Sequence, residues 1–235
     1  MKAIILAGGK GTRLRPYTTV IPKPLVPVGD KTILEILIEK LKGFGVTDIV
    51  LCVNHMAALI MAYFGDGVKW GVKIEYSQED KYLGTVAPIK LVKDLPENFL
   101  VMNGDLLTDL NVRDLYNYHL QNGALLTIAT YKREIQIDFG VIDIDENKNI
   151  AIGFHEKPVH ESNVSMGVYV FNRELLSYVP DNMHFGFDDL MHKLLHNKKI
   201  IKVYPFSGYW LDIGRAADYD KANEDIDIIT GRKQK

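Results

Sequence analysis

The chain has 235 residues, of which 47% are hydrophobic, and a formal net charge of −2. This length and composition suit one domain with one substantial core, and the charge excludes a broad nucleic-acid surface, which needs a basic excess. No apolar run approaches the ~20 residues of a membrane-spanning helix. The single cysteine, Cys52, lies in an apolar run typical of a core in a reducing compartment. We therefore expect a cytoplasmic protein with no membrane partner.

The first half of the chain alternates short apolar runs with amphipathic helical patterns. Alternating strands and helices favour a parallel sheet with right-handed crossovers. The predicted strands are 2–7, 48–53, 72–76 and 99–102, and the predicted helices are 31–42, 56–64, 85–92 and 112–120.

After residue 123 strands dominate, with few helices between them. The predicted strands are 125–131, 141–144, 150–154, 164–171 and 200–204, and the predicted helices are 187–196 and 215–225. The whole pattern predicts an α/β protein with a Rossmann-like, mixed but mainly parallel sheet flanked by helices. We expect a single domain over 1–225 with two halves, about 1–123 and 124–225, and a flexible tail over 226–235.

The most informative segment is 7–24, which reads AGGKGTRLRPYTTVIPKP directly after the first predicted strand. Gly8, Gly9 and Gly11 allow a tight turn and a close approach of backbone to a ligand. Successive N–H groups in such a turn form an anion site. The segment is neither a Walker loop nor a dinucleotide fingerprint, because it lacks Gly-Lys-Ser/Thr and the third glycine of the latter.

Three cations follow the glycines. Arg13 and Arg15 offer planar forks of donors, and Lys23 offers a point charge held in an extended segment by Pro22 and Pro24. A glycine turn followed by a solvated basic loop is the plainer interpretation. Three cations and a proline-braced lysine after a buried strand favour a site for a polyphosphate instead.

The stretch LAGGKGTRLRPYT, followed by PKPLVPVGDKTILE, resembles the N-terminus of the nucleoside-triphosphate:sugar-1-phosphate nucleotidyltransferases. The mannose-1-phosphate guanylyltransferases and their heptose-phosphate relatives are the most similar groups. The resemblance implies Mg²⁺-dependent transfer of a nucleotide to a hexose- or heptose-1-phosphate, with release of pyrophosphate, in the biosynthesis of cell-surface polysaccharides. It also implies that residues 1–123 form the nucleotide-binding half and residues 124–225 the sugar-phosphate-binding half. Many relatives add a C-terminal left-handed β-helix, and we expect none here.

Two aspartates are candidate ligands of Mg²⁺. Asn103-Gly104-Asp105 follows the fourth predicted strand, at the sheet edge where open α/β sheets bind ligands. An ordinary Asn-Gly-Asp turn is the alternative. Asp212 in GYWLDIG could equally cap the next helix. The resemblance implies that Asp105 and Asp212 together hold the metal.

The sequence Glu156-Lys157-Pro158 would by itself suggest only a surface ion pair. The resemblance implies that Glu156 accepts hydrogen bonds from sugar hydroxyls and that Lys157 contacts the sugar phosphate. It also places Gly140, Ser165 and Gly167 near the sugar. Ser165 and Met166 stand where mannose-type relatives read Asn-Ala, which would change the shape and polarity of the sugar pocket.

Leu83-Gly84-Thr85 opens a predicted helix, so it is either a plain helix start or a turn that approaches the nucleoside. The resemblance of EDKYLGTVAPI to the family's base-binding turn favours the second interpretation and favours GTP. Gln78 and Glu79 precede this turn and are both candidates for contact with the base. The nucleotide-binding residues that we expect are Leu6, Ala7, Gly8, Gly9, Gly11, Thr12, Arg13, Gln78, Gly84, Thr85, Asn103 and Gly104.

We expect Arg13, Lys23 and Lys157 to act in catalysis, on the leaving pyrophosphate, the reacting phosphates and the incoming phosphate respectively. The substrates would be a nucleoside triphosphate and a sugar-1-phosphate, and a homodimer is one option for the assembly. The alternatives are the same chemistry with CTP or UTP, a catalytically silent regulatory paralogue, and a glycosyltransferase. The last class usually shows Asp-x-Asp, whereas Asn103-Gly104-Asp105 has only the second aspartate.

Overall fold

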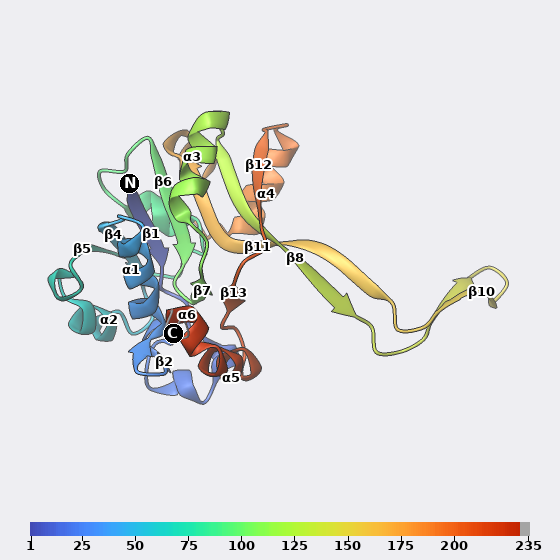
Figure 1. Ribbon diagram of the computed structural model, residues 1–235. Coiled ribbons are helices and arrows are strands. Elements are labelled where there is room, and N and C mark those ends of the chain that lie inside the picture. The colour runs from blue at the N-terminus through green and yellow to red at the C-terminus, as the bar shows by residue number, and fades with distance from the viewer. Residues whose placement is uncertain (231–235) are drawn as a thin grey trace.

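A seven-stranded sheet forms the centre of the protein (Figure 1), and the computed structural model describes residues 1–230. The strand order is β12-β8-β11-β6-β1-β4-β5, and only β11 runs antiparallel to its neighbours. The strands are β1 (Lys2–Leu6), β4 (Asp48–Val53), β5 (Lys73–Gln78), β6 (Asn98–Asn103), β8 (Leu126–Gln136), β11 (Val159–Asn172) and β12 (Ile201–Phe206). The predicted mixed, mainly parallel sheet is confirmed.

Helices cover both faces of this sheet, which is why its central strands are apolar throughout. α1 (Ile33–Gly43), α2 (Ala57–Phe64) and α3 (Val112–Asn122) pack on one face, and α4 (Phe187–His196) packs on the other. Ile4 of β1 points into the second core while its neighbours Ala3 and Ile5 point into the first.

The helix predicted over 85–92 is only a short 3₁₀ helix, η5 (Ala87–Leu91). The N–H groups of Val86 and Ala87 both donate to the carbonyl of Phe185, and Pro88 has no N–H to donate. These contacts hold the segment against the start of α4 instead of beginning an α-helix.

β8 and β11 continue beyond the sheet as a two-stranded arm (Figure 1). We call residues 131–137 and 158–164 the stem, and residues 138–157 the tip. The tip contains the hairpin of β9 (Val141–Asp145) and β10 (Ile150–His155). The sequence predicted these strands but not their projection from the body, since periodicity does not report the direction of a strand.

A third, smaller core joins the loop after β1 to the C-terminal elements. Its short strands and helices are β2 (Pro27–Val28), β3 (Lys31–Thr32), β7 (Leu106–Thr108), β13 (Trp210–Asp212), α5 (Ala216–Glu224) and α6 (Ile226–Thr230). The predicted tail therefore begins too early, because α6 occupies its first five residues and buries Ile229. The rest of that tail, 231–235, lies outside the described residues. No helix in the described part of the chain is long and apolar enough to cross a membrane.

Candidate active site

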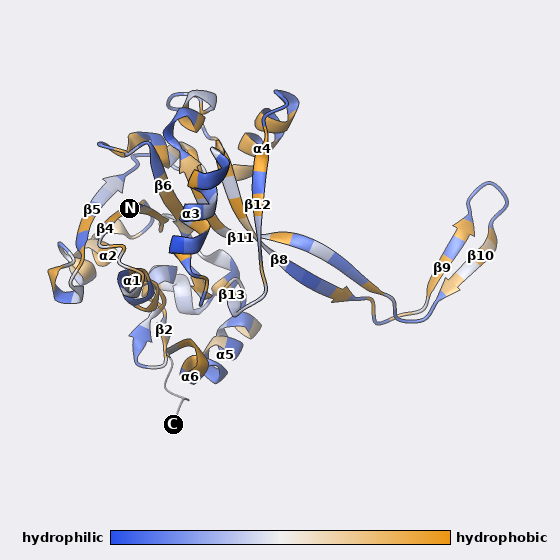
Figure 2. Cartoon of the chain, turned by 45° about the horizontal axis from the view of Figure 1, so that its top comes forward, coloured by the Kyte–Doolittle hydropathy of each residue, from blue (hydrophilic) through white to orange (hydrophobic). Residues whose placement is uncertain are grey.

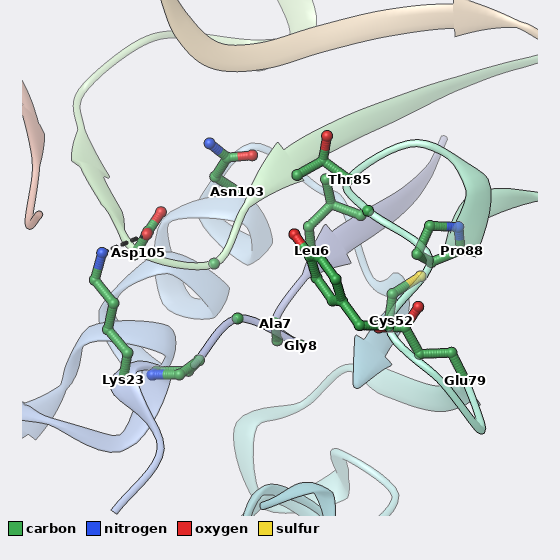
Figure 3. A pocket seen from close by; sticks show the side chains of 15 residues that line it. Leu6, Ala7, Gly8, Lys23, Cys52, Glu79, Thr85, Pro88, Asn103 and Asp105 are labelled. Carbon is green, nitrogen blue, oxygen red and sulfur yellow. Dashed lines mark hydrogen bonds and ion pairs between the residues drawn. The ribbon is translucent and has the colours of Figure 1, made fainter. Parts of the chain in front are cut away.

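The glycine loop leaves the carboxyl end of β1, between the ends of β4 and β6, and it forms one wall of a pocket (Figure 3). Gly8 lies tightly packed: a Cβ there would come within 3.2 Å of the Asn54 side chain and 3.3 Å of a carboxylate oxygen of Glu79. No such contact surrounds Gly9. The loop thus presents backbone rather than side chains to the pocket, as close approach of a ligand requires.

Lys23 and Asp105 form an ion pair at one end of this pocket, with 2.5 Å between Nζ and Oδ2 (Figure 3). Lys23 is only 8% exposed and lies in the 3₁₀ helix η3 (Lys23–Leu25), beside Pro22 and Pro24. Asp105 follows the end of β6 in the sheet. The ammonium and the carboxylate are therefore held together at the sheet edge by segments that are 82 residues apart.

Asp212 belongs to the same site. β13 pairs with β7, and the N–H of Ile213 donates to the carbonyl of Asp105 at 3.1 Å. Burial raises the pKa of Asp212, and the negative charge of Asp105 adds to this, while Lys23 and Arg13 lower it. Two carboxylates are thus held close together beside two cations.

Among the described residues, three buried carboxylate oxygens lack a hydrogen-bond partner, and two of them are Oδ1 of Asp105 and Oδ1 of Asp212. The third, Oδ1 of Asp48, lies at the opposite edge of the sheet, at the start of β4. Two neighbouring unpaired carboxylate oxygens suit Mg²⁺, which takes one or two carboxylates together with substrate phosphates. Within residues 1–230 no group of three or more His, Cys, Asp or Glu is placed to bind a metal.

The other end of the pocket combines apolar and aromatic side chains with a buried carboxylate. Its walls include Cys52, Glu79, Tyr82 and Pro88, and Figure 3 shows the labelled side chains of three of them on the side away from Lys23. Glu79 is buried, which raises its pKa, and its Oε2 accepts the N–H of Leu83 at 2.8 Å. A buried acceptor therefore faces the part of the pocket farthest from the ion pair.

Most of the predicted nucleotide-binding residues come together in this pocket. The ones that line it are Leu6, Ala7, Gly8, Gly9, Gly84, Thr85, Asn103 and Gly104. Gly84 has φ +94°, and a Cβ there would lie 2.7 Å from the carbonyl oxygen of Phe185. The hydroxyl of Thr85 accepts the N–H of Phe187, so it caps α4 rather than a helix of its own.

Four predicted residues lie elsewhere. Gln78 lines a different hollow, and its neighbour Glu79 takes the place in the pocket. Gly11 and Thr12 lie at the start of the 3₁₀ helix η1 (Thr12–Leu14), where Gly11 has φ +60° and its carbonyl accepts the Thr18 hydroxyl. Arg13 lies beside Gly214 and lines a second cleft, on the Asp212 side of the site.

This second cleft lies at the base of the arm and is basic. It is lined by Arg13, Tyr131, Arg133, Trp210, Leu211, Asp212, Gly214, Arg215, Asp218 and Lys221. Sequence patterns did not reveal Arg133, Arg215 and Lys221, because isolated basic residues far apart in the chain form no motif. The cleft continues the site beyond the carboxylates, on the side away from Glu79.

The predicted sugar-binding residues fall into two groups. Gly167 has φ +73°, and a Cβ there would lie 2.6 Å from the Asn103 amide, so its backbone adjoins the pocket. Ser165 nearby donates a hydrogen bond to the Tyr169 hydroxyl at 3.0 Å. Gly140, Glu156 and Lys157 all lie in the tip of the arm, outside both the pocket and the cleft.

Together, the fold and the site define an α/β nucleotide-binding protein, with a glycine loop, a buried lysine and paired carboxylates at one sheet edge. The family model described as "Nucleotidyl transferase" matches residues 2–228, and the chain belongs to this family.

Relatives in the family differ in the nucleotide that their names specify. The chain is 35% identical to the UTP--glucose-1-phosphate uridylyltransferase of Synechocystis and 33% identical to the mannose-1-phosphate guanyltransferase of Candida albicans. These matches cover 94% and 93% of this chain but only 62% of each relative. The crystal structure of HddC from Yersinia pseudotuberculosis is 27% identical, with a TM-score of 0.75 over 96% of this chain and 99% of that one. The same protein complexed with GMP-PN gives a TM-score of 0.70.

Proposed function

We propose that this protein is a sugar-1-phosphate nucleotidyltransferase, which converts a nucleoside triphosphate and a hexose- or heptose-1-phosphate into a nucleoside-diphosphate sugar and pyrophosphate. The observation that carries the proposal is the meeting of the Lys23–Asp105 pair, Asp212 and Arg13 at the end of the glycine loop. Two cations and two carboxylates at one place suit two phosphate-bearing substrates. Family membership supports the same reaction class.

In this reaction an oxygen of the sugar phosphate attacks the α-phosphorus of the triphosphate, and the bond to the leaving pyrophosphate breaks. A phosphate monoester is already a nucleophile. The protein therefore needs to position the two substrates and neutralise their negative charge, and it does not need to activate the nucleophile. We assign Lys23 to the reacting phosphates and Arg13 to the pyrophosphate. Asp105 and Asp212 would hold Mg²⁺, which supplies positive charge between the two anionic substrates when it is bound.

For the base we propose guanine, and Glu79 supports this choice. Guanine presents a ring N–H and an adjacent amino group, two donors side by side that a carboxylate can accept. Glu79 is buried at the nucleoside end of the pocket and keeps Oε1 near Gly8. Uracil offers a single N–H on its corresponding edge, so UTP would donate one hydrogen bond to this carboxylate where GTP would donate two. The uridylyltransferase relative makes UTP the second candidate.

The test is a panel of the four nucleoside triphosphates against mannose-, glucose-, glucosamine- and heptose-1-phosphate, with Mg²⁺, read as release of pyrophosphate. We expect one strong combination with GTP, and we expect Glu79→Gln to lower the preference for GTP over UTP. Strong pyrophosphate release with UTP or CTP would overturn the proposed preference for guanine and would still support nucleotidyl transfer. Release of a nucleoside diphosphate from a finished nucleotide sugar would instead indicate a glycosyltransferase, and silence across the panel would favour a regulatory paralogue.

A further inference from the structure

The tip of the arm is an amphipathic ribbon with an uncovered apolar face. Phe154 pairs directly with Ile142, and two residues along β9 Ile144 pairs with Ala151, beside an irregularity of the pairing that contains Ile152. Ile152 and Phe154 are 66% and 63% exposed. The opposite face carries the ion pair of His155 with Asp143 at 3.0 Å. Figure 2 shows the hydrophobic residues concentrated on these strands, far from the body.

An isolated two-stranded hairpin is marginally stable in water and needs a surface to cover its apolar face. The arm cannot fold back to cover this face on the body of its own chain, and its Lys157 cannot reach the basic cleft of that chain. β8 and β11 pair without interruption from Tyr131↔Val164 to Gln136↔Val159, and the N–H of Ile137 then donates to Pro158. Tyr131 lines the basic cleft. Seven residues of paired strand place Lys157 about 20 Å from it, farther than a lysine side chain reaches.

The tip and the basic cleft have opposite charges. Residues 138–157 contain five acidic and two basic residues, a net charge of −3. The cleft has four cationic and two acidic side chains, a net charge of +2. An exposed apolar surface lies beside the cleft, because Tyr17 stacks on Tyr219 of α5, whose residues Asp218 and Lys221 line the cleft. The same chain therefore carries both halves of a complementary contact, at a separation that prevents them from meeting within one copy.

We propose that two copies of this chain form a two-fold symmetric dimer by exchanging arms. The tip of each copy covers its apolar face on the body of the other, at the basic cleft and the loop around Tyr17. A closed two-fold contact of this kind uses the same two surfaces twice. It carries Glu156 and Lys157 of one copy to the cleft of its partner, next to Asp212. Each active site is then built from two chains. The last step rests on the proposed function, since it assigns Lys157 to the incoming sugar phosphate.

The first experiment measures the molar mass of the full chain by light scattering over a wide range of concentration. We expect a dimer of the 26.6 kDa chain, and a folded monomer for the double variant Ile152→Glu/Phe154→Glu. The control is Val68→Glu, which places one such charge at a 72% exposed apolar residue of the body and should leave the dimer intact. A monomeric wild-type chain, or a dimer that survives the double variant, would overturn the exchange of arms.

The second experiment tests the shared site by complementation. Asp105→Asn and Lys157→Ala should each be inactive alone. Co-expressed in equal amounts, they should recover about a quarter of wild-type activity, because half of the dimers are mixed and each mixed dimer has one site with both native residues. The shared site would be overturned if the co-expressed variants were as inactive as each variant alone, or if Lys157→Ala alone had near-native turnover.

The two proposals fail in different ways. An active wild-type monomer would overturn the dimer and keep the nucleotidyl transfer. A wild-type dimer that depends on its arms but releases no pyrophosphate with any substrate pair would overturn the proposed function and keep the exchange of arms.

Discussion

The body buries its apolar side chains, whereas the tip of the arm leaves its own exposed to solvent. In the body, β6 buries Phe99, Val101 and their neighbours on both faces of the sheet, because helices cover each face. In the arm, β9 alternates apolar and acidic residues, and Ile142 and its partner Phe154 on β10 remain exposed. An apolar side chain stabilises the fold by roughly 1.5–3 kcal/mol only when it is removed from water. The body therefore carries the stability of one copy, and the arm keeps its apolar surface for a contact outside that copy.

The same contrast divides the chemistry. The glycine loop, Lys23 and Asp105 come from segments that the cores hold rigidly, so their geometry is complete within one chain. Glu156 and Lys157 lie in the arm. Substitutions in the body should therefore change activity or stability within one copy, whereas substitutions of the apolar residues of the arm should act through association.

The largest effect should come from Asp105→Asn. The amide keeps an oxygen that accepts from Lys23, so the fold should persist, while the site loses one of its two metal-binding charges. We expect pyrophosphate release to fall on the order of 10²–10³-fold, with an unchanged unfolding midpoint. The control is Asp48→Asn, which also neutralises a carboxylate with a buried, unpartnered Oδ1 and an ion pair to a lysine, Lys2, but at the other edge of the sheet. Equal losses in both variants would contradict the assignment.

In the core of the body, Phe171→Ala should have the next largest effect, on stability rather than directly on chemistry. Phe171 is fully buried in the core that α4 covers, and it contacts the rings of Phe99 and Tyr169. Truncation should lower the free energy of unfolding by about 3–5 kcal/mol through lost burial and the remaining cavity. Chemical denaturation of the variant measures this directly. A loss below about 1 kcal/mol would mean that the body is packed more loosely than the structure indicates.

A smaller effect is expected from acid, which should lower the free energy of unfolding of the body through His119. Its Nε2 lies 3.0 Å from the acceptor Asn98 Oδ1 and its Nδ1 lies 2.8 Å from the Thr127 hydroxyl, an arrangement that suits the neutral ring. Burial lowers the pKa of His119 from 6.5 to about 4. Between these values the unfolded chain binds a proton that the folded chain does not, so stability is fully present above pH 6.5 and falls as the pH falls towards 4.

The loss approaches about 1.4 kcal/mol for each pH unit within that window. Urea denaturation at several pH values measures it, and the control is His119→Gln, which keeps hydrogen-bonding groups but does not titrate. The two proteins should therefore differ in the slope of stability against pH. Parallel slopes would show that His119 is protonated in the folded state.

Much of the body could be predicted from the sequence because its signals are local. Ile33 to Leu41 follow a helical stripe, and Thr32 with Glu35 forms the capping box that starts α1. The glycine loop, Lys23, Asp105 and Gly84 were likewise placed by short motifs, and the structure brings them to one edge of the sheet. Gln78 and Glu79 show the limit: the sequence offers both as candidates for contact with the base, and the structure places Glu79 in the pocket and Gln78 in a different hollow. Neighbours at the end of a strand point to opposite sides, and the sequence does not reveal which side faces the pocket.

The arm could not be predicted, because its defining property is not local. The patterns around Ile142 and Phe154 predict half-buried strands, and nothing in them tells which surface buries the apolar half. The sequence did not reveal Arg133, Arg215 and Lys221 for a related reason. These basic residues lie in separate segments and line one cleft only because the fold brings the segments together.

The smallest effect, and the sharpest test of the contrast between body and arm, should come from Phe154→Ala. If the arm contributes only to association, the stability of the wild-type chain must rise with protein concentration by mass action, because the dimer forms from folded copies. Phe154→Ala removes an exposed ring of the tip, so it should abolish most of that dependence. At high dilution it should change the free energy of unfolding by no more than about 0.5 kcal/mol. Val68→Ala, an equally exposed truncation in the body, should keep the full dependence. A Phe154→Ala variant that is destabilised equally at every concentration would instead show that the tip packs within its own chain, and the contrast between body and arm would disappear.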